Sequence, residues 1–376
     1  MFDERDQYYM GRALSLASAA VGLASPNPTV GCVIVRGDEI VGEGWHEYAR
    51  LDHAETVSLR AAGSRAAGAT VYLTLEPCSH HGRTPPCAEG LIAAGVRRVV
   101  VPLIDPNPKV AGQGIEMLHA AGIQVDVGLR TDEARELLEP FACHVTTGRP
   151  LVVAKAGMSL DGRIAAPQND ERWITSAEAR DFGQSLRLKL DAILAGVGTV
   201  LADDPELTYR GGSPKSRPLA RVILDSHLRT PVRARMFACS RAPILIFCAP
   251  DAPAQRRQEL ESAGAEVVSL PAGVSGVDLK PVLDELGKRD ILGLLVEGGS
   301  AVHWSFVSAG LVDKFYFILA PMVLGGTAVP AIGGAGYATL REAARFKMRR
   351  TFSVGPDLAL ETYPSFSRSI LSPWKK

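Results

Sequence analysis

Short apolar runs alternate with amphipathic stretches along residues 1–147. Apolar runs bounded by Gly, Pro or Asp favour buried strands, whereas apolar residues spaced three and four apart favour helices. We therefore predict strands over 30–35, 40–44, 70–75, 96–103 and 123–127, and helices over 53–62, 87–94 and 114–121. The first two strands form a hairpin that turns at Gly37 and Asp38. Strands that alternate with helices indicate a layered α/β domain.

The N-terminal stretch has the pattern of an amphipathic helix. Met10, Leu14, Ala17 and Val21 recur at helical spacing. A secretory signal would begin with a basic segment, whereas this chain begins with an acidic one. We therefore expect a helix of the folded domain at this end of the chain.

The alternation of strands and helices restarts after a short linker at 146–150, whose sequence is Thr-Thr-Gly-Arg-Pro. Further strands are predicted over 151–156, 192–195, 221–224, 244–248, 267–270, 293–297 and 315–319. A chain of 376 residues exceeds one ordinary core. We predict two α/β domains, 1–147 and 148–376, the second with a largely parallel sheet.

Composition excludes several classes of protein. Lys plus Arg and Asp plus Glu both number 41, so the chain has no basic excess with which to attract nucleic acid. No apolar run reaches the roughly 18–20 residues that a membrane span needs. Six cysteines in a chain of this length are not a disulfide framework. We expect a cytoplasmic protein that binds neither nucleic acid nor membrane, and in which Cys32, Cys143, Cys239 and Cys248 belong to the core.

His53, Cys78 and Cys87 are the residue types that hold a catalytic zinc ion. Such a site uses three protein ligands and leaves the fourth position for a water, whose pKa falls toward ~7. Glu55, two residues after the histidine, is suited to take the proton of that water and pass it to a leaving amine. Zinc deaminases have the signature H-x-E followed by P-C-x-x-C, in which the Glu is not a ligand.

Two features of this motif leave alternatives open. Eight residues separate the cysteines where the signature has two, and residues two apart on a helix point roughly 200° from each other. A closed structural zinc site with His80 or His81 as the fourth ligand is one alternative. A disulfide between Cys78 and Cys87 is another.

The chain resembles the bifunctional deaminase–reductases of riboflavin biosynthesis. The motifs that carry this resemblance span nearly the whole chain in order: PNPTVG at 26–31, GWH at 44–46, HAE at 53–55, LEPCSHHGRTPPC at 75–87, KAGMSLDG at 155–162, WITS at 173–176, LADDP at 201–205 and VEGG at 296–299. The resemblance implies a cytidine-deaminase-like α/β/α domain followed by a dihydrofolate-reductase-like α/β domain that uses NADPH.

The resemblance also implies roles for individual residues. In the first domain, substrate contacts fall on Asn27, His46, Arg83, Asp105 and Asn107, although the last two also suit a turn. In the second domain, cofactor contacts fall on Gly157, Trp173, Thr199, Asp203, Ser226, Gly299, Ser300 and Ala301. Substrate contacts there fall on Glu171, Arg187, Leu207, Arg210 and Glu297.

Two positions depart from the family pattern. Arg50 stands where the family has Gly, which suggests a change in the loop before His53. Glu171 stands where the family commonly has Ser, which would place a negative charge near a phosphate. Arginine suits phosphate because its guanidinium offers a planar fork of donors.

The sequence therefore predicts a two-step enzyme: zinc-dependent deamination of a phosphoribosylated diaminopyrimidinone, then NADPH-dependent reduction of the ribosyl group to ribityl. We expect small phosphoribosyl-pyrimidine substrates and a homo-oligomer. Two rival readings are a polynucleotide or free nucleobase deaminase with an accessory domain, and a non-catalytic zinc-stabilised binding module.

Overall fold

The computed structural model describes residues 2–81, 85–167, 173–274 and 276–365. It divides into two compact units whose main parts are Met1–Gly148 and Arg149–Ser213 with Pro218–Ser369; the short segment Pro214–Arg217 groups with the first unit. No helix in the described part of the chain combines the length and the apolar character that a bilayer crossing needs.

The first unit is built on a five-stranded sheet in the order β2-β1-β3-β4-β5. Strands β1 (Gly31–Arg36) and β2 (Glu39–Trp45) form the predicted hairpin, and β1 also pairs antiparallel with β3 (Thr70–Leu73). Strands β4 (Arg98–Val101) and β5 (Gln124–Val127) continue the sheet in parallel with β3.

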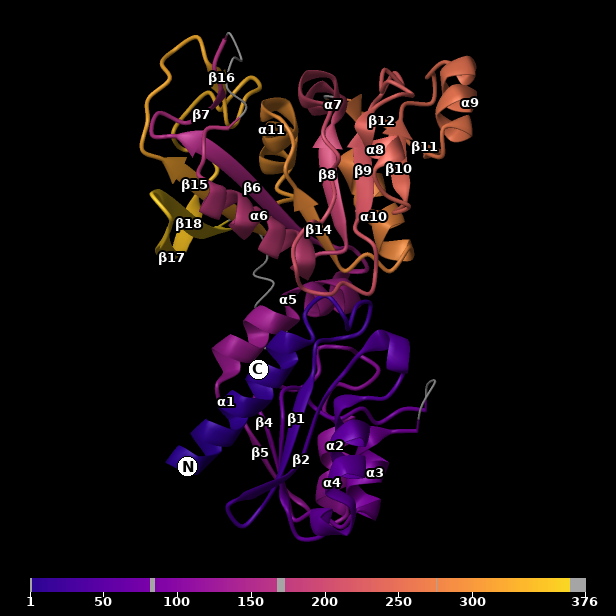
Figure 1. Cartoon of the computed structure of the whole chain (residues 1–376), viewed down its shortest axis with the longest axis vertical. Helices are drawn as coiled ribbons and strands as arrows, with labels where there is room; N and C mark the ends of the chain where they lie inside the picture. The colour runs from indigo at the N-terminus through magenta and orange to yellow at the C-terminus, as the bar shows by residue number, and fades with distance from the viewer. Residues whose placement is uncertain (1, 82–84, 168–172, 275, 366–376) are drawn as a thin grey trace. The chain divides into compact units, whose positions relative to one another are not determined.

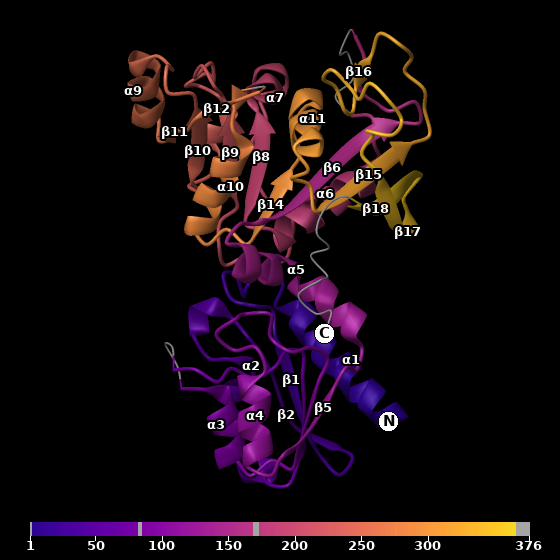
Figure 2. The same cartoon turned by 180° about the vertical axis from the view of Figure 1, so that it is seen from behind.

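Helices cover both faces of this sheet (Figures 1 and 2). On one face lie α2 (Ala54–Ala62), α3 (Cys87–Ala93) and α4 (Gln113–Ala120). On the other face lie α1 (Glu4–Ala19) and α5 (Thr131–Thr147). The predicted α/β/α layering is therefore confirmed.

The amphipathic N-terminal helix is also confirmed, with one change at its end. Met10, Leu14 and Ala17 are buried in α1, but Val21 lies beyond the last residue of the helix. Asp6 of α1 accepts hydrogen bonds from Tyr72 (2.8 Å) and Arg98 (2.7 Å), which join this helix to β3 and β4.

Glycines let the helices of the first unit approach the hairpin closely. A Cβ on Gly42 would lie 2.2 Å from the Ser58 carbonyl oxygen of α2, and one on Gly44 would lie 2.7 Å from the Ala54 carbonyl oxygen. The Ser58 hydroxyl, 3.1 Å from the Cys32 carbonyl oxygen, donates a hydrogen bond to β1 across the same contact. Helix α2 therefore lies directly on the strands, and its first turn is fixed in place.

The linker region contains the end of a helix and a tight turn. Helix α5 ends at Thr147, and Gly148 follows with a φ of 76°, which favours glycine. Arg149 then forms a bidentate ion pair with Asp313, at 2.6 and 2.8 Å. Asp313 also accepts the backbone N–H of Val152 at 2.8 Å, so the first residues of the second unit are anchored to its sheet.

The second unit contains a nine-stranded sheet in the order β11-β10-β9-β8-β14-β6-β15-β18-β17. The strands from β11 to β15 are parallel, and β18 and β17 continue the sheet antiparallel. In chain order these strands are β6 (Leu151–Ser159), β8 (Ala192–Gly196), β9 (Ala220–Leu224), β10 (Ile244–Cys248), β11 (Glu266–Ser269), β14 (Gly293–Val296), β15 (Lys314–Ala320), β17 (Phe346–Val354) and β18 (Asp357–Pro364). The predicted largely parallel sheet is confirmed.

Helices and short strands connect these elements. The helices are α6 (Ala177–Lys189), α7 (Val197–Asp203), α8 (Arg235–Ala238), α9 (Ala254–Ser262), α10 (Leu279–Lys288) and α11 (Ser300–Ser308). Two small ribbons pair β7 (Arg163–Ala165) with β16 (Val329–Pro330), and β12 (Ala272–Gly273) with β13 (Gly276–Val277).

One expectation about the core is wrong. Cys32, Cys143 and Cys248 are buried as expected, but Cys239 is exposed. Cys239 caps the C-terminus of the short helix α8, and Met236 is the residue of that helix that enters the core. Apolar neighbours in the sequence therefore did not imply burial here.

We predict that Gly42→Ala will loosen the contact between α2 and the hairpin. The added methyl group must push the backbone of Ser58 away, so we expect a loss of about 1–3 kcal/mol in the free energy of unfolding. Urea unfolding of the purified protein measures this loss. Gly90→Ala is the control, because its Cβ would find only ordinary contact with Leu59 at 3.6 Å; an equal loss in both variants would contradict the prediction.

Candidate functional site

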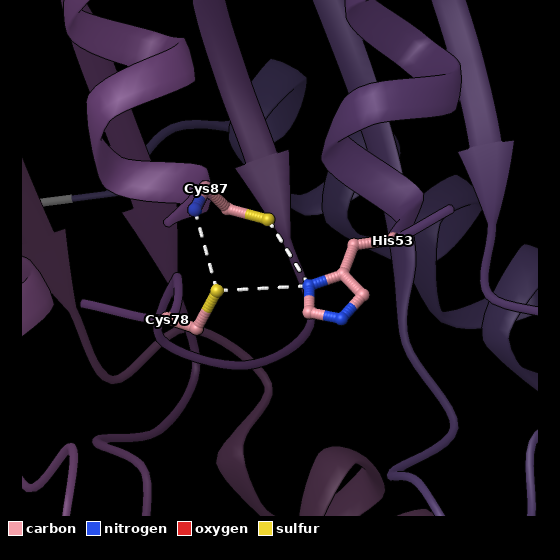
Figure 3. A group of neighbouring side chains, drawn as sticks. All are labelled: His53, Cys78 and Cys87. Atoms are coloured by element: carbon pink, nitrogen blue, oxygen red, sulfur yellow. Dashed lines mark hydrogen bonds between the residues drawn. The ribbon is translucent and has the colours of Figure 1, made fainter. Parts of the chain in front are cut away.

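Side chains from three separate segments meet above the first sheet. The Nδ1 atom of His53 lies 3.2 Å from the Cys87 sulfur and 3.6 Å from the Cys78 sulfur (Figure 3). All three potential ligand atoms lie within 4.8 Å of one another. One nitrogen and two sulfurs at this spacing are suited to bind zinc, which prefers such ligands.

Local backbone geometry turns these side chains toward one point. His53 is the N-cap of α2, with an extended ψ of 159°, so it stands outside the helical rotation. Cys87 is the first residue of α3, and its backbone N–H donates to the Cys78 sulfur at 3.3 Å. The wide spacing of the two cysteines in the sequence therefore ends in a close contact.

Glu55 lies in the first turn of α2, beside the three potential ligands. Its side chain is buried and hydrogen-bonds with the Cys87 side chain. Burial, followed by the nearby Cys78, raises the pKa of Glu55 to about 7. Because His53 is the cap and not a helical residue, the angle between helical residues two apart does not keep Glu55 away from the cluster.

The environment of Cys78 favours a thiolate, which is the form that binds metal. Hydrogen bonds from Cys87 and His53 lower the pKa of Cys78 to about 4 against the opposing effect of burial. The donor set and its charge therefore fit a zinc ion.

The alternative readings of this motif do not agree with the structure. Cys78 and Cys87 are both free cysteines, so they form no disulfide. Among the described residues, the group of potential metal ligands contains His53, Cys78 and Cys87 without His80 or His81. The His81 side chain is exposed and lies 3.9 Å from Glu89.

His46 and Asn27 form a second layer behind His53. The Asn27 amide donates to Nε2 of His46 at 3.0 Å, so Nδ1 of His46 carries the proton and donates to the Asp52 carbonyl oxygen at 2.9 Å. Burial lowers the pKa of His46. Its ring meets the His53 ring edge to face, with centroids 5.4 Å apart. The structure thus brings together two of the predicted substrate-contact residues and a predicted metal ligand.

Asp105 and Asn107 lie in the segment that follows β4. Asp105 accepts the Asn107 backbone N–H at 2.8 Å, and the Asn107 side chain accepts the Lys109 N–H at 3.1 Å. Burial, helped by the charges of Glu76 and Cys78, raises the pKa of Asp105 to about 7 against the opposing hydrogen bond from Asn107. The turn that we weighed as an alternative is therefore present. Arg83, the remaining predicted contact of this unit, lies outside the described residues.

The departure at Arg50 does not strain the loop at that residue. Arg50 ends a single 3₁₀ turn (Tyr48–Arg50) and pairs with Glu47 at 2.9 Å. Leu51 has the positive φ, 64°, and its side chain is exposed. The strained position therefore lies one residue after the departure and directly before Asp52 and His53.

Glu76 is a residue whose role the sequence did not reveal. It lies two residues before Cys78, is buried, and accepts backbone N–H groups from the segment 105–115. A charged residue inside an apolar run was the available signal, because buried carboxylates need partners.

In the second unit, predicted cofactor residues gather where parallel strands end. Gly196, the last residue of β8, and Gly298, after β14, allow the two strand-to-helix turns to touch: a Cβ on Gly298 would lie 2.5 Å from Ala195, and one on Gly196 would lie 2.7 Å from Val302. A Cβ on Gly299 would lie 3.1 Å from the Thr199 hydroxyl. Ligands of open α/β sheets bind at this carboxyl edge.

The remaining predicted cofactor residues surround the same edge. Gly157 lies on β6, next to Thr175; Ser226 follows β9; Asp203 ends α7; and Ser300 and Ala301 begin α11. The buried Ser300 hydroxyl has no hydrogen-bond partner among the described residues. Buried polar groups are usually hydrogen-bonded, so this hydroxyl is available to a ligand. Trp173 is 52% exposed, and the Arg180 guanidinium stacks over its ring at 5.0 Å.

Arg187 and Glu297 form an ion pair in this region. Arg187 donates to both carboxylate oxygens of Glu297, at 2.5 and 3.3 Å, and to the Thr208 carbonyl oxygen at 2.6 Å. Burial alone would raise the pKa of Glu297, but Arg187 and then Lys155 outweigh it and lower the pKa. This carboxylate is therefore held in its charged form.

The other predicted substrate residues of the second unit are placed differently. Arg210 donates to the Thr208 hydroxyl at 3.1 Å and pairs with Glu206 at 3.0 Å, which puts it near Arg187. Leu207 is buried in a core cluster, so its side chain points away from solvent. Its φ is positive, at 52°. Glu171 lies outside the described residues.

Comparison with protein families matches both units. Residues 3–103 match the family described as the cytidine and deoxycytidylate deaminase zinc-binding region, and residues 150–360 match the RibD C-terminal domain. A zinc-binding deaminase unit is therefore followed by a reductase unit of the RibD type.

Curated relatives match along the whole chain. The riboflavin biosynthesis protein RibD of Escherichia coli is 43% identical over 362 residues, which cover 95% of this chain and 98% of the relative. That of Aquifex aeolicus is 40% identical over 360 residues, which cover 96% and 99%. The chain belongs to the RibD family of riboflavin biosynthesis proteins.

Solved structures agree with this assignment. Acinetobacter baumannii RibD has a TM-score of 0.86 with 37% identity, covering 96% of this chain and 99% of the other. A Thermotoga maritima protein described as a diaminohydroxyphosphoribosylaminopyrimidine deaminase and 5-amino-6-(5-phosphoribosylamino)uracil reductase has a TM-score of 0.83 with 32% identity, covering 96% and 99%. The predicted pair of a cytidine-deaminase-like domain and a dihydrofolate-reductase-like domain is confirmed.

Proposed function

We propose that this chain catalyses two consecutive steps of riboflavin biosynthesis. The first is zinc-dependent hydrolytic deamination of 2,5-diamino-6-(5-phosphoribosylamino)pyrimidin-4-one, and the second is NADPH-dependent reduction of the ribosyl group to ribityl. The observation that supports the first step most directly is the cluster of His53, Cys78 and Cys87 beside the buried Glu55. Membership of the RibD family supports the pairing of the two steps.

In the deamination, the protein's own contribution is to bind the ring and to move protons. Zinc held by His53, Cys78 and Cys87 would supply a hydroxide nucleophile at neutral pH. Glu55 takes the proton of the attacking water and passes it to the leaving amine, and its buried position beside the three metal ligands suits both transfers. The burial of Glu55 keeps bulk water from competing for that proton.

The substrate of this step would lie against the second layer of residues. Asn27 and His46 line the site behind His53, and Asp105 and Asn107 approach from the segment after β4. Arg83 would offer its guanidinium fork to the phosphate. The roles of Asn27, His46 and Arg83 follow from the family motifs that these residues occupy.

In the reduction, the chain would place NADPH along the carboxyl edge of the second sheet. Gly157, Trp173, Thr199, Asp203, Ser226, Gly299, Ser300 and Ala301 would line the cofactor, which supplies the hydride. The unpartnered hydroxyl of Ser300 supports a ligand at this position. Arg187, Leu207, Arg210 and Glu297, together with Glu171, would meet the substrate, and the two arginines suit its phosphate.

We also propose that the enzyme is a homo-oligomer. Strand β17 is the last strand of its sheet, and most of its residues are exposed, including Met348 at 60%. An exposed edge strand presents unpaired backbone N–H and C=O groups that can pair with another chain. Sedimentation velocity tests the proposal, and a single monomeric species at micromolar concentration would contradict it.

We predict that Glu55→Gln will abolish deamination and leave reduction intact. The amide keeps the shape of the side chain but cannot accept and return the proton, so ammonia release should fall by at least about 100-fold. Zinc content should stay at the wild-type level, and NADPH oxidation with supplied aminouracil substrate should continue at the wild-type rate.

Two further variants complete this test. Glu89→Gln removes a half-exposed carboxylate in the first turn of α3 and should change neither activity. Cys78→Ala should lose both the metal and deamination, because it removes a ligand. Ammonia release at the wild-type rate by Glu55→Gln would remove this residue from the mechanism.

We predict that Gly299→Ala will weaken NADPH binding. Gly299 has a φ of 66°, and a methyl group would lie 3.1 Å from the Thr199 hydroxyl. A sparsely populated backbone conformation of this kind costs other residues about 1–3 kcal/mol, so the backbone and Thr199 should shift away from the cofactor. We expect a several-fold rise in the KM for NADPH with unchanged deamination in the same preparation. An unchanged KM would place the cofactor elsewhere.

A further inference from the structure

Glu76 joins two segments of the deaminase unit through four backbone hydrogen bonds. Its Oε2 atom accepts from the N–H groups of Asp105 at 2.8 Å and Gly112 at 3.0 Å. Its Oε1 atom accepts from those of Gly114 at 2.9 Å and Ile115 at 3.3 Å. The side chain is only 3% exposed, so these N–H groups take the place of its hydration.

The carboxylate is well matched to its place at the start of α4. Three of its four donors belong to the N-terminal cap and first turn of this helix, where N–H groups have no partner within the helix. A negative charge there also interacts favourably with the helix dipole. Hydrogen bonds to a charged acceptor are stronger than those between neutral groups.

These bonds hold the segment 103–115 directly against the zinc-binding segment. The backbone N–H of Glu76 donates to the Leu103 carbonyl oxygen at 3.2 Å. On the other side, a Cβ on Gly114 would lie 2.0 Å from the Pro77 carbonyl oxygen, so the backbones of the two segments touch there. Cys78 follows Pro77, and Asp105 is itself one of the residues bonded to Glu76.

We propose that Glu76 is a positioning residue for deamination, one that sets the distance between the metal-binding Cys78 and the segment that carries Asp105 and Asn107. This inference rests on the proposed deaminase function and on those two residues as substrate contacts. Glu76 faces backbone N–H groups through both oxygens, so its effect on the reaction passes through the segment that it holds.

Glu76→Gln is the direct test. A glutamine has one oxygen, so its NH₂ group must face either the N–H groups of Asp105 and Gly112 or those of Gly114 and Ile115. The NH₂ group then faces two backbone N–H groups that are also donors, so both of those hydrogen bonds are lost. One end of the segment 105–115 is no longer held by residue 76. We expect kcat/KM for deamination to fall about 10- to 100-fold, mainly through a higher KM. Bound zinc and reduction of supplied aminouracil substrate should stay at wild-type levels.

Glu116→Gln is the matched control, because it makes the same change of charge and shape at an exposed position in the first turn of α4. It should behave as the wild type. Glu76→Asp keeps both oxygens on a shorter side chain, and its KM should lie between those of the wild type and Glu76→Gln. If Glu76→Gln fails to fold, the KM of the aspartate variant decides the question.

Three outcomes would overturn the proposal: unchanged kcat and KM in the folded Glu76 variants, full recovery on addition of zinc, or a loss confined to kcat that follows the unfolded fraction. The last two would make Glu76 a structural residue only. Failure of the proposed function would look different, because the wild type and Glu116→Gln would then both release no ammonia.

Discussion

The contact between helix α2 and the β1–β2 hairpin is the constraint on which the first site depends. Gly42 and Gly44 have no side chains, so the backbone of α2 lies directly on the strands. This contact fixes where the helix begins, and therefore where His53, as its cap, and Glu55, in its first turn, are held. The cysteines come from the other side, one at the start of α3 and one beyond β3. The chemistry of this unit is thus built on helix beginnings, where side chains and free N–H groups point to the same region.

The second unit follows a related plan with different residues. The turns after β8 and β14 touch through glycines, and this contact gathers Thr199, Gly299 and Ser300 at one edge of the sheet. The ion pair between Arg187 and Glu297 lies near this edge and keeps the carboxylate charged without exposing it fully. In both units, therefore, glycines allow two backbone segments to lie in contact, and this contact positions the polar side chains of the site.

The sequence predicted the parts of the structure that depend on local pattern. The zinc-ligand set was predictable because its residue types are specific, and the parallel strands were predictable because they are continuous apolar runs. Strand β17 was missed because exposed cations such as Lys347 and Arg350 interrupt its apolar pattern at the edge of the sheet, and the neighbouring β18 was missed with it. The convergence of His53 and Glu55 depends on a cap conformation that helical spacing does not give. Glu76 escaped notice because its donors lie 29 to 39 residues away in the chain.

The two hydrogen bonds of the His46 ring determine its protonation state. One nitrogen accepts from Asn27 and the other donates to Asp52, so the ring can gain a second hydrogen only by giving up the Asn27 contact. Because both of its ring nitrogens are hydrogen-bonded, His46 is not suited to transfer protons. His46 is therefore held neutral beside His53, and it adds no positive charge to compete with a bound cation.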